Sequence, residues 1–364
     1  MKSFVRIAAA LAWLIALAWC LDSAYAQNNW PSWRGPTADG HSSETGLPQR
    51  WSQASIQWTS PLPGNGQSSP IIWGDRIFLT ASVANGCTRL VVCLHRDDGK
   101  ELWRKVAWEG EPEPSHAMNG WASASCATDG ERVVAFFGIG GLHCYSVQGD
   151  LLWSRELGSF EGPWGTAASP IIVRNMVIQN CDADGEAYLI AVDKFSGDTI
   201  WKTNRPANRG WSTPVLLRTD ETEEIVLNGH TGVTAYDPNS GKQLWHCACT
   251  QGRGSPTVTP SAGMLYVLNG LSDGGAYCVV PGGTGDVTAT HRKWITRRGG
   301  RDLSSPIVLG ETMLAMGLRS SILTAYDIRD GRQLWEKRIG GQISASPIAF
   351  EGRAYFIDER GKTI

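Results

Sequence analysis

Charged residues are scarce in this sequence. Asp, Glu, Lys and Arg make up only 19 % of the 364 residues, and the formal net charge is −2. A chain without a basic excess lacks the electrostatic footprint of a nucleic-acid binder, so we expect no nucleic-acid partner. The apolar content of 42 % is ample for a packed core and excludes an intrinsically disordered chain.

Familiar catalytic motifs are also missing. The sequence has no Gly-x-Ser-x-Gly, no His-Glu-x-x-His, no phosphate-binding loop and no Cys-x-x-Cys-His, and its seven His show no ligand spacing. Asp182-Ala183-Asp184-Gly185 resembles part of a calcium loop but lacks the remaining oxygen ligands and the distal Glu, which favours a hairpin turn. We therefore expect no catalytic residue, no metal site and no cofactor.

The first 26 residues have the composition of a signal peptide. Lys2 and Arg6 precede an apolar run over residues 7–21, and Ala24-Tyr25-Ala26 is the small-x-small pattern cleaved by signal peptidase. The run is short for a membrane span, although an uncleaved anchor stays open. A lipoprotein is disfavoured because Trp19, a large residue, precedes Cys20. We predict export with cleavage after Ala26 to the periplasm or cell surface, with no transmembrane segment in the mature chain.

What the sequence does contain is an internal repeat built on tryptophan. A turn with Gly, three further residues and Trp recur at Trp103, Trp153, Trp201, Trp245 and Trp335. Trp294 closes a degenerate copy, and Trp58 stands where a copy before Trp103 should end. The successive spacings of these Trp are 45, 50, 48, 44, 49 and 41 residues.

A second phrase runs in step with the first. Ser-Pro, or a variant of it, precedes an apolar stretch, a Gly or Asn turn and a second strand, at Ser69-Pro70, Ser125-Cys126, Ser169-Pro170, Thr213-Pro214, Ser255-Pro256, Ser305-Pro306 and Ser346-Pro347. No stretch shows a sustained 3.6-residue apolar period, so helices are minor. Short, evenly spaced strands, four to a period of 41–50 residues, predict an all-β chain folded as a β-propeller of four-stranded blades.

These residues carry a family resemblance. The Gly-x-x-x-Trp repeat, with alanine and aspartate positions as in Thr324-Ala325-Tyr326-Asp327, resembles the tryptophan-docking repeat of pyrroloquinoline-quinone (PQQ)-like β-propellers over about residues 30–364. Residues 30–36 and 162–170 are similar to a narrower group of exported PQQ-like repeat proteins found in planctomycete-type bacteria. Relatives of this family include the propeller lipoprotein of outer-membrane barrel assembly and the quinoprotein dehydrogenases.

The repeats also suggest how the chain is divided. Seven inner-strand phrases are visible, and the last copy stops within its strands at residues 361–364. The resemblance implies an eight-bladed design with an incomplete last blade, and seven blades is the alternative. We expect the strand ending at Trp58 to pair with the last blade, since open edges invite aggregation. The predicted parts are a signal peptide (1–26), an N-terminal extension packing on the propeller (27–57) and the propeller itself (58–364).

Repeated residues have structural explanations. Each large Trp ring can fill the space between neighbouring blades while its indole N–H finds a backbone acceptor, which we predict for Trp58, Trp103, Trp153, Trp201, Trp245, Trp294 and Trp335. Cys93, Cys144 and Cys278 stand where other copies have Ala, so we interpret them as small packed residues. A disulfide between Cys87 and Cys93 stays open, because an exported chain permits it.

Function is sought where the repeats differ. Residues that enter each inner strand should surround the mouth of the central channel, and our candidate ligand-facing residues there are His116, Asn119, Trp121, Trp164, Arg209, Trp211, Arg253 and Arg301, with Asn65, Gln67 and Gln342 beside them. Arginines can hold an anion by paired hydrogen bonds. Trp faces can stack on a sugar or quinone ring. The alternative is that these side chains satisfy one another and water inside a polar channel.

Three functions follow, in order of preference. The first is a non-catalytic binding scaffold in the cell envelope, with envelope proteins or an extracellular polymer as partner. The second is a quinoprotein dehydrogenase, for which the resemblance implies PQQ with Ca²⁺, a catalytic Asp and a disulfide of adjacent cysteines. This chain instead has Cys247-Ala248-Cys249, with one residue too many. The third is a carbohydrate-binding propeller.

Overall fold

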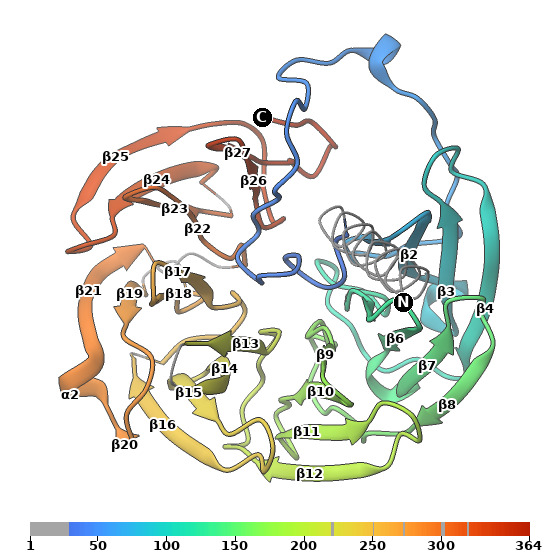
Figure 1. Ribbon diagram of the computed structural model, residues 1–364, viewed down its shortest axis with the longest axis horizontal. Helices are drawn as coiled ribbons and strands as arrows, with labels where there is room; N and C mark the ends of the chain where they lie inside the picture. The colour runs from blue at the N-terminus through green and yellow to red at the C-terminus, as the bar shows by residue number, and fades with distance from the viewer. Residues whose placement is uncertain (1–28, 220–221, 250, 272–273, 300–302, 319) are drawn as a thin grey trace, which may run out of the picture.

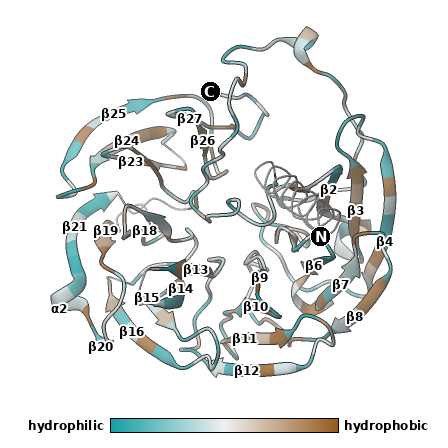
Figure 2. Cartoon of the chain, viewed as in Figure 1, coloured by the Kyte–Doolittle hydropathy of each residue, from teal (hydrophilic) through white to brown (hydrophobic). Residues whose placement is uncertain are grey.

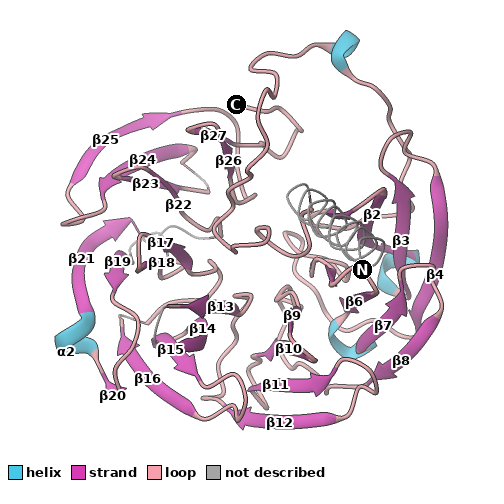
Figure 3. Ribbon diagram, viewed as in Figure 1, coloured by secondary structure: helices cyan, strands magenta, loops and turns pink. Residues whose placement is uncertain are grey.

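Seven sheets follow one another around a ring in the computed structural model (Figure 1). The structure describes residues 29–219, 222–249, 251–271, 274–299, 303–318 and 320–364, so the predicted signal peptide and Arg301 lie outside the described residues. Strands and loops account for nearly all of the ring (Figure 3). In the part described, no helix has the length and apolar character needed to span a membrane. The prediction of an all-β propeller is confirmed.

Each of six sheets has four antiparallel strands in sequence order, from the centre of the ring outward. The first three sheets are β1 (Ile71–Trp73), β2 (Arg76–Val83), β3 (Thr88–His95) and β4 (Glu101–Glu109); β5 (Ala127–Thr128), β6 (Arg132–Phe136), β7 (Leu142–Ser146) and β8 (Leu151–Arg155); and β9 (Ile171–Val173), β10 (Met176–Cys181), β11 (Tyr188–Asp193) and β12 (Thr199–Asn204). The 3-10 helices are η1 (Gln53–Ser55), η2 (Ala84–Gly86) and η3 (Gly138–Gly140).

The second half of the ring repeats this plan with one addition and one reduction. It comprises β13 (Val215–Arg218), β14 (Glu223–Gly229), β15 (Gly232–Tyr236) and β16 (Gln243–Ala248); β17 (Thr259–Ser261), β18 (Met264–Leu268), β19 (Gly275–Val279) and β21 (Arg292–Gly299); β22 (Ile307–Leu309), β23 (Thr312–Met316), β24 (Ile322–Asp327) and β25 (Gln333–Arg338); and β26 (Ile348–Phe350) with β27 (Arg353–Tyr355). The fourth sheet gains a fifth strand, β20 (Gly285–Asp286), and the seventh has two described strands.

A series of hydroxyl groups links neighbouring sheets at the centre. Two residues before each inner strand stands a Ser or Thr, and its backbone N–H donates to the side-chain oxygen of the equivalent residue in the next sheet. Six such bonds of 2.9–3.3 Å connect Ser69, Ser125, Ser169, Thr213, Thr257, Ser305 and Ser346. We call these residues the hydroxyl series. The repeat of Ser-Pro in the sequence therefore marks a contact between sheets as well as the start of a strand.

The predicted position of the Ser-Pro phrase is wrong in the fifth sheet. The sequence predicts Ser255-Pro256 there, but the hydroxyl series and the start of β17 show that Thr257-Val258 occupies this position of the repeat. The Ser255 side-chain oxygen is buried without a hydrogen-bond partner in the described part of the chain. Pro256 stands two residues before Val258, so Ser255-Pro256 resembles the repeated phrase in sequence but does not occupy its structural position.

At the outer rim, indole groups link the sheets in a second way. Five indole N–H groups donate to a backbone oxygen of the following sheet over 2.8–3.0 Å, from Trp58, Trp103, Trp153, Trp201 and Trp294. Each ring also covers a glycine of the turn before the outer strand. A Cβ at Gly99, Gly149, Gly197, Gly241 or Gly331 would lie 2.3–2.9 Å from a ring carbon. The glycine of the repeat is required by this close approach and by its positive φ.

Two of the repeated tryptophans depart from this pattern. The connection before β21 is long, and it contains β20 and α2 (Thr288–His291), which cover β16. Trp245 is consequently fully buried and donates to a carboxylate oxygen of Glu224 at 2.9 Å. Burial raises the pKa of Glu224. Trp335 on β25 is 46 % exposed, and its indole N–H has no hydrogen-bond acceptor among the residues described.

The segment before Trp58 corrects a further expectation. No strand is formed between residues 56 and 64, so the predicted pairing of this segment with the last sheet is not observed. Residues 30–42 instead contact both the first and the last sheet. Trp30 bridges to Ile72 of β1, and His41 bridges to Ala349 of β26. This segment is drawn in blue across the middle of the ring in Figure 1.

A small residue faces each outer tryptophan. The residue paired with Trp across the two outer strands is Cys93, Cys144, Ala191, Ala235, Cys278 or Ala325, and all six are fully buried. A β-bulge follows this pair in all six sheets. Cys87 and Cys93 are both free thiols, so the Cys87–Cys93 disulfide is not formed. Burial raises the pKa of Cys93 to about 11 and that of Cys144 to about 12.

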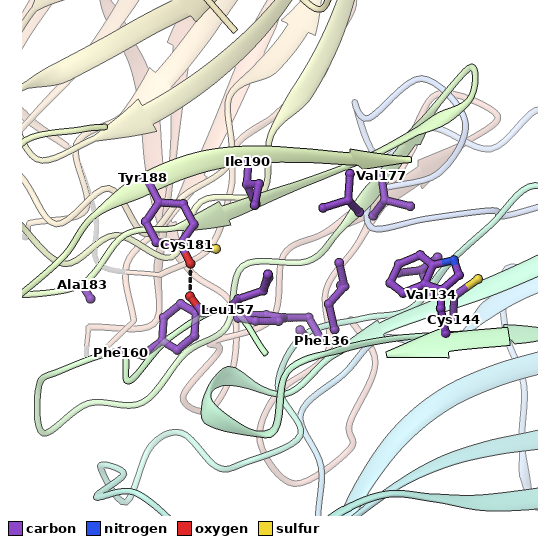
Figure 4. Packing of buried hydrophobic residues seen from close by; sticks show 14 residues of the cluster. Val134, Phe136, Cys144, Leu157, Phe160, Val177, Cys181, Ala183, Tyr188 and Ile190 are labelled. Atoms are coloured by element: carbon purple, nitrogen blue, oxygen red, sulfur yellow. Dashed lines mark hydrogen bonds between the residues drawn. The ribbon is translucent and has the colours of Figure 1, made fainter. Parts of the chain in front are cut away.

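The core lies between adjacent sheets rather than in one central cluster. Figure 4 shows one such layer, in which Phe136 of β6 and Val177 and Ile190 of the next sheet pack together. The Tyr188 hydroxyl donates to the carbonyl oxygen of Leu157 within this layer. Apolar and polar segments alternate around the rim in Figure 2. Stability therefore depends on contacts between neighbouring sheets, which the hydroxyl series and the indoles hold in register.

Replacing a member of the hydroxyl series tests its contribution. Ser169→Ala removes the acceptor of the buried Ser125 N–H, so we expect the free energy of unfolding to fall by about 1–3 kcal/mol. Chemical denaturation followed by tryptophan fluorescence measures it. Ser159→Ala, at an exposed serine, serves as the control and should change stability by less than about 0.5 kcal/mol. Equal effects of the two variants would contradict the role of the series.

The tryptophan repeat supplies its own comparison. Trp201→Phe removes a buried hydrogen bond to Pro238 and part of the contact with Gly241, so we expect a loss of about 2–4 kcal/mol in the free energy of unfolding. Trp335→Phe, at an exposed ring, should cost less than about 1 kcal/mol. Similar losses in the two variants, measured by thermal or urea unfolding, would show that the indole contacts between sheets are unimportant.

Candidate functional site

A cavity of about 490 Å³ lies where the inner strands begin. Six members of the hydroxyl series line it: Ser69, Ser169, Thr213, Thr257, Ser305 and Ser346. Their side-chain oxygens already accept backbone N–H groups, except at Ser69, so these hydroxyls can offer their own protons to a bound molecule or to water. The bonds that join the sheets thus also make the cavity wall polar.

The N-terminal extension closes the cavity on one side. The Trp33 indole N–H donates to the Thr257 hydroxyl at 3.1 Å, and Trp33 lines the cavity. Arg34 donates to the Pro306 carbonyl and the Thr259 hydroxyl. Burial lowers the pKa of Arg34 to about 10, although the charge of Asp39 opposes this shift. Trp33 and Arg34 contact residues at or after the hydroxyl series, whereas most of the remaining wall comes from the loops before the series, with Leu318 added from the β23–β24 connection.

On the side of the cavity away from Trp33, the residues His116, Asn119, Arg209 and Arg253 surround Trp164. We call this side the mouth. The His116 ring lies 4.4 Å from the Trp164 ring, centroid to centroid. Two guanidinium carbons lie near the same ring centroid, Arg209 at 5.9 Å and Arg253 at 6.0 Å. Asn119 donates to the carbonyl oxygen of Trp164 at 2.8 Å and so holds this loop in place. The result is an indole face bordered by one imidazole and two cations.

The two arginines of the mouth are in different electrostatic states. Arg209 forms a paired contact with Asp184, with nitrogen–oxygen distances of 2.8 and 2.6 Å. Arg253 is exposed, and no carboxylate or other hydrogen-bond acceptor contacts its guanidinium within the described residues. Only Arg253 therefore has its full donor set available for a ligand.

The Asp182–Gly185 turn shows why a calcium loop does not form there. Asp184 is paired with Arg209, and Asp182 is paired with the buried Arg205 at 2.7 Å. Burial lowers the pKa of Arg205, but the charge of Asp182 and the Tyr236 hydroxyl outweigh it and raise the pKa overall. Both carboxylates are neutralised by protein cations, and the segment connects β10 to β11 as a turn.

Five of the eight predicted ligand-facing residues line the cavity: His116, Asn119, Trp164, Trp211 and Arg253. Gln67 lines it as well. Arg209 instead lines an adjoining side pocket of about 380 Å³, which shares Trp164, Trp211 and Arg253 with the main cavity. The Trp211 indole N–H donates to the Gly165 carbonyl at 2.8 Å, which leaves its ring at the border of both spaces.

The remaining candidates lie elsewhere. Trp121 lines neither space: its N–H donates to the Glu113 carbonyl, and its ring lies against Gly86, where a Cβ would approach to 2.2 Å. The Gln342 side chain donates to Glu359 at 3.0 Å. Arg301 is not among the described residues. Trp121 has the sequence position of a mouth residue, but the absence of a side chain at Gly86 lets its ring turn away.

Two contributors were not predicted from the sequence. Trp33 belongs to the conspicuous run of residues 30–36, but only the folded chain shows that it reaches the cavity. From the sequence alone, the members of the hydroxyl series indicate only where a strand begins. The sequence signal that could have revealed this contribution is the regular spacing of one Ser or Thr per sheet, which places these side chains at equivalent positions around the central cavity.

The cavity residues do not fit calcium. Calcium takes six to eight oxygen ligands, mostly from carboxylates, yet none of the described cavity-lining residues is Asp or Glu. No cluster of three or more His, Cys, Asp or Glu suited to a metal ion occurs within the described residues. Cys247 lies on the outer strand β16 and Cys249 directly follows it, so neither takes part in the cavity.

Sheets of this kind around a central cavity, joined by a tryptophan repeat, define a PQQ-like β-propeller. The chain belongs to the family described as outer membrane protein assembly factor BamB, whose model matches residues 50–180 and 185–362. A search of curated proteins finds no match.

Solved structures agree on the fold. BamB from Moraxella catarrhalis is similar with a TM-score of 0.59 and 14 % identity, covering 85 % of each chain. A europium-containing methanol dehydrogenase gives 0.51 and 10 % identity, covering 93 % of this chain and 89 % of that one. The quinohemoprotein alcohol dehydrogenase ADHIIG from Pseudomonas putida HK5 gives 0.52 and 11 %, covering 91 % and 75 %. At these identities the likeness concerns the fold alone, and it is shared by an assembly factor and by dehydrogenases.

Proposed function

We propose that this protein is a non-catalytic binding scaffold of the cell envelope, exported by its first 26 residues. The observation that carries the proposal is the pairing of an unneutralised cation with an aromatic face at the mouth. Arg253 lies near the Trp164 ring and has no acceptor in the described structure, while Trp164 is held in place by its own loop contacts. An indole face beside an available guanidinium favours a partner with an acidic group next to a flat apolar group.

A dehydrogenase function is disfavoured by the composition of the cavity. A dehydrogenase of this family's kind would need a carboxylate to take the alcohol proton and further carboxylates for calcium. The described wall offers hydroxyls, amides, indoles, one imidazole and one guanidinium instead. Hydroxyl and indole groups bind neutral or acidic partners well, but they are poor bases near neutral pH. An envelope protein or an acidic extracellular polymer therefore fits these residues better than PQQ with Ca²⁺.

Carbohydrate is the second candidate. The rings of Trp164 and Trp211 both border the cavity and its side pocket, and flat aromatic faces of this kind can stack on sugar rings. An acidic sugar would use the rings and Arg253 together. The two candidates differ in whether the bound group is part of a polypeptide or a glycan.

A pair of variants tests the mouth. Arg253→Gln removes an available charge-assisted donor, so we expect the affinity for acidic envelope proteins or acidic oligosaccharides to fall about tenfold or more. Trp164→Ala should weaken binding similarly by removing the stacking face. Mature protein is immobilised and presented with an envelope extract and with an oligosaccharide array, and bound material is quantified.

The matched control is Arg297→Gln, at an exposed arginine on the outer strand β21. It removes the same charge without touching the cavity, and binding should be unchanged. If Arg253→Gln and Arg297→Gln weaken binding equally, only the net charge matters and the proposed mouth is wrong. If neither mouth variant changes binding, the ligand-facing surface lies elsewhere.

A further inference from the structure

The outer strands can be compared position by position, because the repeated tryptophan and the bulge set a common register. The residue immediately before Trp is aliphatic in five of the six sheets, at Leu102, Leu152, Ile200, Leu244 and Leu334. Four of these side chains are 40–45 % exposed, and Leu244 is less exposed. The same residue type thus has a different environment in the fourth sheet.

The chain itself shows what covers this position. β20 runs parallel to β16, with Gly285 opposite Trp245 and Asp286 opposite His246. Val287 follows directly, donates its N–H to the His246 carbonyl at 2.9 Å and is buried in the cluster against which Leu244 packs. The outer edge of a sheet in this protein therefore accepts an extended segment that adds an aliphatic side chain to the apolar cluster against which the leucine packs. Figure 1 shows β20 beside β16 at the rim.

Among the open edges, β8 is exceptional. Two residues before Trp, the other sheets have polar residues (Glu101, Thr199, Gln243, Arg292 and Gln333), whereas β8 has Leu151. One residue after Trp, β4, β12 and β25 carry Arg104, Lys202 and Glu336, whereas β8 has Ser154 and β21 has Ile295, and β21 alone of these two has charged residues before its Trp, at Arg292 and Lys293. Leu151 and Leu152 are 57 % and 45 % exposed. Charged side chains commonly protect edge strands from pairing, and β8 lacks them at these positions.

We propose that the edge of β8 binds an extended segment of a partner polypeptide, paired with Leu151–Arg155 in parallel as β20 is with β16. An aliphatic side chain of the partner would join Leu152 in an apolar cluster, as Val287 and Leu244 belong to one cluster on the fourth sheet. The main-chain bonds supply affinity, and the two leucines select an apolar sequence. A second copy could not supply its β20, which is already held on its own β16, and we propose an extended, apolar segment of a different protein as the occupant. This surface lies outside the cavity, and the inference is independent of the function proposed for the mouth.

Selection from a random peptide library tests this directly. Twelve-residue peptides are displayed, selected on the mature chain and then counter-selected on the Leu151→Lys/Leu152→Lys double variant. We expect enriched peptides with aliphatic residues, at least tenfold weaker binding to the double variant, and at least tenfold slower amide exchange within residues 151–155 when a peptide is bound. Thermal unfolding of the variant should match that of the unchanged chain, since both leucines are exposed.

The matched control is Leu102→Lys, which adds a charge at the equivalent position of β4. Binding to this variant should be unchanged. The proposal is overturned if no peptide is enriched, if the double variant binds as well as the unchanged chain, or if the protected amides lie on another strand. A concentration-dependent dimer that the double variant abolishes would also overturn it, because the occupant would then be a second copy.

Discussion

The hydroxyl series is the contact on which the rest of the ring depends. Six of the seven inner strands begin two residues after a Ser or Thr whose N–H donates to the next sheet, so an isolated sheet would leave such a donor without this partner. Neighbouring sheets are therefore held at a constant distance at the centre. The same side chains form the wall of the cavity, which joins the assembly of the ring to the chemistry of its central space.

The outer rim obeys a separate constraint, and its exceptions are informative. Where the glycine turn of one sheet lies under the tryptophan of the sheet before it, the indole N–H donates to a main-chain oxygen and the ring packs on the glycine. In the fifth sheet the turn is replaced by a longer connection, and Trp245 finds a carboxylate instead. That connection also produces β20, the one described strand added to an outer edge. A local failure of the repeat has thus created a new kind of contact, and it shows how outer edges can be used.

Much of this arrangement could be predicted from the sequence, because repeats compare a chain with itself. The tryptophan spacing predicted the sheets, and the exchange of Cys for Ala identified the small residue opposite Trp. The predicted repeat position is wrong at Ser255-Pro256, because a dipeptide cannot show which of two nearby hydroxyl residues bonds to the next sheet. At the mouth, sequence position predicted five residues that line the cavity, but it could not show how the side chains are oriented. Trp121 turns toward Gly86, Arg209 is neutralised by Asp184, and Trp33 arrives from a segment outside the repeats.

The proposed binding scaffold would hold its partner at the mouth without redox chemistry. A titration of the purified mature protein with PQQ and Ca²⁺ tests it most directly, with tryptophan fluorescence reporting binding and dye reduction by a panel of alcohols and sugars reporting turnover. The indoles of Trp33, Trp164 and Trp211 border the cavity, so an occupant there would alter the emission. We predict no saturable change at micromolar cofactor and no substrate-dependent reduction of the dye. Saturable binding accompanied by turnover would contradict the account and identify a compact quinoprotein with an unusual set of ligands.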